Sequence, residues 1–170
     1  MFMRKLYFII GVLLAIALLW WLAGKANPGF FYLDALPLAH AAEQSLPILY
    51  VCDSIGWDIK TDSPRLCYPG MSTRQIRSLV SLAPDVRCRY VVLITGTNDL
   101  LTDEPEQILN QEIALLSNAC GEKFKAPVFI VSPWVVRSLA KTHSSDGIHL
   151  NPEGRQRLIE MYPCLVDNAH

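Results

Sequence analysis

The sequence predicts an α/β domain with a doubly wound, mainly parallel sheet flanked by helices in three layers, preceded by a transmembrane helix. Four short apolar runs rich in β-forming residues are separated by segments with helical periodicity. Gly, Pro or polar residues end each run, as expected where strands meet loops. Residues 6–23 carry no charged side chain. A chain of 170 residues allows one ordinary domain plus an appendage.

The four predicted strands are apolar runs of the kind that a parallel sheet buries on both faces. They cover residues 48–52, 65–68, 90–95 and 128–131. The third run is the clearest, because it is continuously apolar and stops at Gly96. The fourth run stops before Pro133, which cannot extend a ladder of hydrogen bonds.

The helix between the second and third strands has a clear beginning. Ser72 and Gln75 have the spacing of a capping box, and Met71 and Ile76 are placed to form a hydrophobic staple across it. The apolar residues that recur at helical spacing predict the buried stripe of this helix: Ile76, Leu79, Val80 and Ala83.

Two more helices follow. Pro105 stands at the start of the first, where its missing N–H does no harm. The residues of that helix that are expected to face the core of the domain are Ile108, Leu109, Ile113, Leu116 and Cys120. Asn151 is the predicted cap of the last helix, with Pro152 in its first turn. Its expected inward-facing residues are Leu158, Ile159, Tyr162 and Leu165.

The apolar run at residues 6–23 is long enough to cross a bilayer, because eighteen helical residues span about 27 Å. We predict a membrane anchor at 1–24, a proline-punctuated tether at 25–46 and the domain at 47–170. A buried core helix and a cleaved signal peptide, with cleavage near Ala26 or Ala41, are the alternatives. The second alternative implies a secreted protein.

Positive charge predicts the orientation of this anchor. Arg4, Lys5 and the α-amino group precede the apolar run, whereas Lys25 alone follows closely. Positively charged flanks stay in the cytoplasm, so we expect the domain outside it, in the periplasm or at the cell exterior. Trp20 and Trp21 suit the far membrane interface. The net charge of −1 and the lack of a basic run argue against nucleic acid as a partner.

Polar residues follow the first three predicted strands. Ser54 comes after the first, Gly70 after the second and Asn98 after the third. Because the carboxyl ends of parallel strands meet at one edge of a sheet, these residues are expected to converge there. This placement predicts a functional site from the order of the elements alone.

The residue types at this edge fit ester hydrolysis through a serine nucleophile. Ser54 is the predicted nucleophile and His149 the general base, with Asp146 orienting the imidazole. The N–H of Ser54, Gly70 and Asn98 are the predicted oxyanion donors. Taken singly, each residue has an ordinary structural explanation: a helix cap, a loop histidine or a turn residue. Asp53 points away from its neighbour Ser54, so we expect it to hold the loop.

Four blocks in this order resemble the SGNH/GDSL hydrolases: residues 52–54, Gly70, residues 96–99 and residues 146–149. The resemblance extends over about 46–165 and is most specific at 146–154. It implies a flavodoxin-like three-layer fold, a Ser54–His149–Asp146 triad, and an oxyanion hole of Ser54, Gly70 and Asn98. It implies no metal or organic cofactor. Cys52 departs from the family, which usually has Gly there.

The expected function is removal of short acyl groups, acetyl above all, from a cell-envelope glycan. The alternatives are a lysophospholipase or thioesterase, an O-acetyltransferase with the same site, and a catalytically degenerate binding module. Only twelve residues separate Pro133 from Asp146, which leaves no obvious lid. Trp57 and Trp134 are placed near the same edge, where they would stack on a sugar or simply pack in the core. The oligomeric state is not predicted.

The five cysteines show no spacing typical of a zinc site. Outside the cytoplasm, disulfides are expected among Cys67, Cys88, Cys120 and Cys164, with Cys52 as a buried thiol. The alternative is that all five act as small apolar residues in a core.

Overall fold

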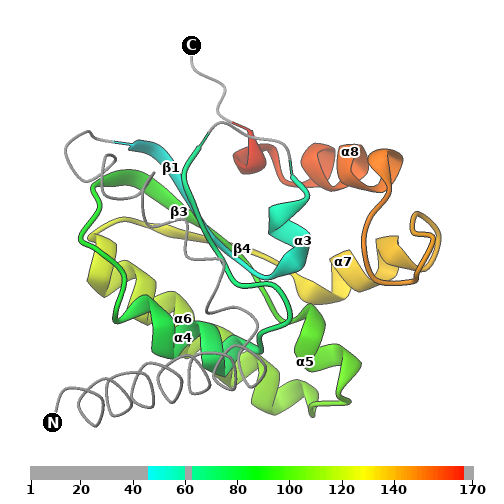
Figure 1. Ribbon diagram of the computed structural model, residues 1–170, viewed down its shortest axis with the longest axis horizontal. Coiled ribbons are helices and arrows are strands. Elements are labelled where there is room, and N and C mark those ends of the chain that lie inside the picture. The colour runs from blue at the N-terminus through cyan, green and yellow to red at the C-terminus, as the bar shows by residue number, and fades with distance from the viewer. Residues whose placement is uncertain (1–45, 60–62, 167–170) are drawn as a thin grey trace, which may run out of the picture.

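A four-stranded parallel sheet forms the centre of the domain (Figure 1). The computed structural model describes residues 46–59 and 63–166. The strands are β1 (Leu46–Cys52), β2 (Arg65–Cys67), β3 (Cys88–Ile94) and β4 (Val128–Val131), in the spatial order β2-β1-β3-β4. Every neighbouring pair is parallel. The α/β class and the four predicted strands are confirmed.

Helices cover both faces of this sheet. On one face lie α4 (Thr73–Val80) and α6 (Glu106–Phe124), and on the other lie α3 (Ser54–Trp57) and α8 (Pro152–Met161) (Figure 1). The remaining helices are α5 (Thr97–Leu101), α7 (Pro133–Ala140) and the short 3-10 helix η2 (Pro163–Leu165). Strand order and layering together make the domain doubly wound, as predicted.

Two hydrophobic cores hold the layers together, one on each face. Alternate residues of β1 divide between them: Leu49 and Val51 face α4 and α6, whereas Ile48 and Tyr50 face α7 and α8. All four are fully buried. This explains why the strand reads as a continuous apolar run, since a central parallel strand is covered on both sides. The Tyr50 hydroxyl donates to the Leu165 carbonyl at 2.7 Å.

The predicted helix starts are confirmed in detail. Ser72 accepts a hydrogen bond from the Gln75 N–H, and the Gln75 side chain accepts one from the Ser72 N–H, which completes the capping box. Asn151 caps α8 by accepting from the N–H of Gly154 at 2.9 Å. Each cap satisfies a backbone donor that would otherwise lack a partner at the first turn.

Three details differ from the sequence predictions. Ile108 is 39% exposed, because the buried stripe of α6 runs through its neighbour Leu109 instead. No helix was predicted at α5 or at α7, although Pro133 occupies the first turn of α7, where proline commonly starts a helix. Helix α8 ends at Met161, so Leu165 reaches the core from η2.

The cysteine prediction was wrong for Cys52. It forms a disulfide with Cys67 and is not a free thiol. The two residues are register partners in β1 and β2, with their Cα atoms 4.5 Å apart, which is within the range that a disulfide spans. Cys88, Cys120 and Cys164 are free.

The predicted anchor and tether lie outside the described residues. Among residues 46–59 and 63–166, no helix is long and apolar enough to cross a bilayer.

Candidate active site

The carboxyl ends of β1, β3 and β4 lead directly into α3, α5 and α7 at one edge of the sheet (Figure 1). Gly70 follows β2 at the same edge, since β2 runs parallel to β1. Ser54, Gly70 and Asn98 are therefore gathered at a common edge, as the alternation of strands and helices predicted.

The turn that carries Ser54 is built around a buried carboxylate. Asp53 is the N-cap of α3 and accepts a hydrogen bond from the Ile55 N–H at 3.0 Å. Its second oxygen accepts from the N–H and the hydroxyl of Thr97. Ser54 is therefore the first residue of the helix and not its cap. The predicted loop-holding role of Asp53 is confirmed.

Burial dominates the ionisation of Asp53. The side chain is fully buried, and desolvation raises its pKa to about 6, although the hydrogen bonds from Thr97 and Ile55 act in the opposite direction. The nearby Asp99 carboxylate adds a smaller upward contribution. Asp53 is thus ionised at neutral pH because its donors partly replace the lost water.

Asn98 is joined to the loop that carries Gly70. It lies in the first turn of α5, and its side-chain amide donates to the carbonyl of Met71 at 2.9 Å. Met71 follows Gly70 directly in the chain. An amide nitrogen has two hydrogens, so one orients the side chain and the other is available to a ligand.

A second buried carboxylate, Asp99, supports this arrangement, and its role was not predicted from the sequence. Asp99 accepts from the N–H and the hydroxyl of Thr73, both at 2.9 Å. Thr73 begins α4, so the contact joins the first turns of α4 and α5. Two signals were available in the sequence: an acidic residue in a first helical turn, and a threonine after the capping serine.

Two backbone donors at this edge have no partner in the described part of the chain. They are the N–H of Ser54 and the N–H of Gly70. Gly70 is exposed, and its φ of 77° is a left-handed conformation that L side chains rarely adopt. Unpaired N–H at a helix start and in an open turn are suited to a developing negative charge.

Asp146 and His149 form a preassembled pair on the loop between α7 and α8. Nδ1 of His149 lies 2.7 Å from one oxygen of Asp146. The other oxygen accepts from the N–H of Ile148 and of His149 and from the Ser144 hydroxyl, each at 2.8 Å. An ionised carboxylate can only accept, so Nδ1 carries the proton and Nε2 is left as the basic nitrogen.

The same contacts hold the pKa of the Asp146 carboxyl well below its usual range. The largest contribution is the hydrogen bond with the His149 side chain, followed by the backbone N–H of His149 and Ile148. The pair is open to solvent: the side chains of His149 and Asp146 are 45% and 48% exposed. Water therefore weakens the attraction between the two side chains. The main effect of these contacts is to fix the orientation of the His149 ring, and they add little to the stability of the fold.

Several contacts shape the loop around this pair. The Arg137 guanidinium, on α7, donates to the Gly147 carbonyl at 3.1 Å. The Asn151 N–H donates to the His143 carbonyl at 2.8 Å, which closes the loop where α8 begins. Gly154 packs so tightly on His143 that a Cβ at this position would lie 2.7 Å from the His143 Cβ.

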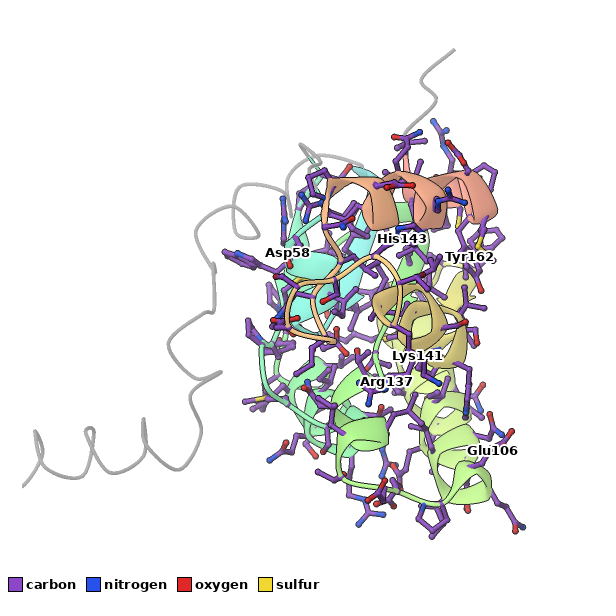
Figure 2. All side chains as sticks on the ribbon, turned by 90° about the vertical axis from the view of Figure 1, so that its right-hand side faces the viewer. Asp58, Glu106, Arg137, Lys141, His143 and Tyr162 are labelled. Atoms are coloured by element: carbon purple, nitrogen blue, oxygen red, sulfur yellow. A yellow bond between two sulfur atoms is a disulfide. The ribbon has the colours of Figure 1, made fainter. Side chains whose placement is uncertain are left out.

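The loop lies on the side of the molecule where α3 and α7 begin. In Figure 1 it is the orange segment at the right, and Figure 2, which faces that side, shows it in front of α3, with Arg137 and His143 labelled around it. No hydrogen bond joins Ser54 to His149 within the described residues. The candidate site thus has two parts: the sheet edge with Ser54, Gly70 and Asn98, and the loop with Asp146 and His149. The contact between Ser54 and His149 remains a prediction.

The two tryptophans have different surroundings. Trp57 ends α3 and is 38% exposed. The Arg65 guanidinium lies 5.5 Å from the centre of its ring and donates to its carbonyl at 2.7 Å. Trp134 is half-buried and packs against the core under α4 and α6. The predicted stacking of either ring on a sugar remains a prediction.

Comparison with known proteins gives a likeness of fold. No family model matches the chain, and no curated protein matches it. A solved structure from Streptococcus pneumonia, provisionally named a platelet activating factor, is similar with a TM-score of 0.59 and 16% sequence identity. The match covers 86% of this chain and 95% of that one. At this identity the likeness shows the fold alone: the chain has the α/β architecture of that protein.

Proposed function

We propose that this chain is a serine ester hydrolase in which Ser54 is the nucleophile, His149 the general base and Asp146 the residue that orients it. The observation that carries the proposal is the Asp146–His149 pair, in which Nδ1 is bound to the carboxylate and Nε2 is left as the basic nitrogen. The unpaired N–H of Ser54 and Gly70 and the second hydrogen of the Asn98 amide support it.

The proposed reaction proceeds through an acyl-serine. Nε2 of His149 takes the proton of the Ser54 hydroxyl as its oxygen attacks the ester carbonyl. The three N–H donors stabilise the resulting oxyanion. The tetrahedral intermediate expels the alcohol, which receives the proton from His149. Water then attacks the acyl-serine, with His149 again as base, and releases the acid and free Ser54.

Labelling and kinetics test this proposal. A fluorophosphonate should modify Ser54, identified by peptide mass spectrometry, and the protein should hydrolyse p-nitrophenyl acetate. Ser54→Ala and His149→Ala should each remove nearly all turnover, and the double variant should be little worse, because the pair acts as a unit. Ser78→Ala is the matched control, since its hydroxyl bonds only a carbonyl of its own helix. Full turnover by Ser54→Ala would refute the proposal.

The solvent exposure of the candidate site supports a substrate that carries a short acyl group on a bulky acceptor. Helix α7 takes up most of the chain between β4 and Asp146, leaving five residues, 141–145, before the pair. Nearly half of the surface of both Asp146 and His149 faces solvent. These features favour an acetylated cell-envelope glycan over a substrate whose long chain needs an enclosed tunnel.

The acyl preference has a direct measurement. We expect kcat/KM to be highest for acetyl esters and to fall toward palmitoyl esters. A steady rise with chain length would favour a lysophospholipase or thioesterase instead. Transfer of acetyl to an added sugar in place of water would identify an acetyltransferase. No turnover and no labelling, together with binding of an acylated glycan, would identify a binding module.

A further inference from the structure

We propose that the disulfide between Cys52 and Cys67 positions the two backbone donors of the oxyanion hole, so that ester hydrolysis requires the oxidised pair. The inference rests on the proposed function, because it assigns a role to the Ser54 and Gly70 N–H groups. It goes further by making the activity of this site depend on a covalent bond that a dithiol can break.

The disulfide stands immediately before both donors. Cys52 ends β1 and Ser54 follows two residues later, while Cys67 ends β2 and Gly70 follows three residues later. The Tyr68 N–H donates to the Cys52 carbonyl at 2.7 Å, so the strands are still paired one residue past the disulfide. The bond therefore joins the two strands at the point where their chains diverge toward the site.

Strand β2 is held at both ends: Arg65, at its start, donates to the carbonyls of Trp57 and Ile59, and the disulfide holds its last residue. The strand is only three residues long, and among the strands that the structure describes it lies at the edge of the sheet and pairs only with β1. Past the disulfide, the amide of Asn98 holds the Met71 carbonyl. A short edge strand is an element that opens at low free-energy cost, and a crosslink at its last residue restricts that motion.

The backbone of α3 rests directly on this disulfide. A Cβ built on Gly56 would collide with the Cys52 Cβ and would lie 2.7 Å from its sulfur. It would also lie 3.4 Å from a methyl group of Ile94, on β3. Both cysteines are buried, and Gly56 lies close against the sulfur of Cys52. Two thiols need more room than one disulfide. Reduction is therefore expected to displace α3, with Ser54 in its first turn, or the end of β2.

The free cysteines lie elsewhere and offer a control. Cys88 begins β3, at the end of the strand opposite the site, and Cys164 lies in η2. Both are half-buried, and burial raises the pKa of their thiols. A protein in which these two are replaced by serine keeps the disulfide and loses the thiols that a reagent most readily reaches.

The reductive step is an ordinary thiol–disulfide exchange. A dithiol attacks one sulfur, the bond between the sulfurs of Cys52 and Cys67 breaks, and a mixed disulfide forms. The second thiol of the reductant then closes its own ring and releases the protein. Two electrons and two protons pass to the protein, giving two cysteine thiols and one cyclic disulfide.

The experiment uses the full-length chain with Cys88→Ser and Cys164→Ser, before and after treatment with dithiothreitol. Alkylation and mass spectrometry report the state of Cys52 and Cys67, and p-nitrophenyl acetate gives kcat and KM. We expect kcat to fall by about 10- to 100-fold on reduction, with KM changed by less than about threefold, because misplaced donors affect the transition state most. Reoxidation should restore kcat. A reduced protein that retains its kcat would overturn the proposal.

A second variant separates positioning from folding. Cys52→Ala with Cys67→Ala removes the bond and leaves smaller side chains. We expect it to fold, with a circular dichroism spectrum like that of the parent, and to show the same selective loss of kcat. If both this variant and the reduced protein unfold, the disulfide serves stability alone and the positioning role is wrong.

Failure of the proposed function would be recognised separately. If the oxidised protein hydrolyses no ester from acetyl to palmitoyl, the hydrolase assignment fails. The positioning claim is then decided by the amide resonances of Ser54 and Gly70 in oxidised and reduced protein. Large shifts confined to these two loops support it, whereas unchanged resonances overturn it.

Discussion

The carboxylate of Asp53 accepts a hydrogen bond from the Thr97 N–H at 3.3 Å and another from the Thr97 hydroxyl. These contacts connect the turn after β1 with the start of α5, across a sequence separation of 44 residues. The residues that follow each of them, Ser54 and Asn98, are the predicted nucleophile and an oxyanion donor. The relative position of these two residues therefore depends on a buried ionic contact beneath them.

Thr97→Val should weaken this contact. The substitution keeps the shape of the side chain but removes a donor from a buried carboxylate, so the free energy of unfolding should fall by about 1–3 kcal/mol at pH 7.5. Urea denaturation measures the change. Thr102→Val is the matched control, since its hydroxyl donates to the backbone carbonyl of Asp99, within α5, at 3.0 Å. Equal stability of the Thr97 variant and the parent would contradict the assigned role.

The pH dependence of stability should carry the signature of Asp53. Its pKa is raised from 3.8 to about 6 in the folded state, so the folded protein binds more protons than the unfolded chain between these values. The contribution of Asp53 to stability is therefore largest below pH 3.8 and declines as pH rises to about 6. Asp53→Asn, which retains an oxygen to cap α3, should lack this decline in urea titrations from pH 4 to 7. An unchanged pH profile would show that Asp53 titrates elsewhere.

Asn98→Ala should lower kcat by about 10²–10³ with a smaller change in KM, because an oxyanion donor is needed most in the transition state. The variant also frees the Met71 carbonyl, which loosens the loop that carries Gly70. Asn110→Ala, at an exposed position of α6, is the control. An effect confined to KM would move Asn98 from oxyanion stabilisation to substrate binding.

Arg137→Ala should reduce kcat by about tenfold through the loop, since small displacements of a catalytic group are costly. The guanidinium holds the Gly147 carbonyl, two residues before His149. Arg137→Lys should recover part of the activity. Arg157→Ala, which removes only a surface pair with Glu153, provides the comparison. Backbone resonances of residues 146–149 should shift in the Arg137 variant alone.

The topology proposal has a cellular test. A reporter that is active only outside the cytoplasm, fused after His170, should be active, and the full-length protein should remain in the membrane fraction. Release of a soluble form beginning near Ala26 or Ala42 would establish the signal-peptide alternative. An inactive reporter would reverse the predicted orientation.

The sequence predicted the sheet and its helices because local signals were strong. The run at 90–95 is apolar throughout, and Ser72 with Gln75 forms a capping box that depends on neighbours only. The edge at which Ser54 and Asn98 lie followed from strand order. The Asp146–His149 contact was also predicted, since both residues share one short loop.

The contacts that were not predicted from the sequence depend on strand register and tertiary packing. The Cys52–Cys67 bond requires β2 to pair with β1 in a particular register, which no local pattern specifies. The contact of Asp99 with Thr73 joins two helix starts 26 residues apart. Ile108 follows the apolar period of α6 but lies on its solvent side, because the period alone allows either neighbour to face the core.

The two parts of the candidate site differ in how deeply the contacts that hold them are buried. Ser54 and Asn98 are chain neighbours of two carboxylates, Asp53 and Asp99, that are buried in the domain. Asp146 and His149 are held mainly by bonds within their own exposed loop, with one contact from Arg137 on α7. Exposed loops open at a lower free-energy cost than core elements do. Heat or mild denaturant should therefore uncouple the base from the nucleophile while the sheet is still intact. If Ser54 and His149 act together as proposed, ester hydrolysis should be lost at a lower temperature than the one at which the sheet unfolds.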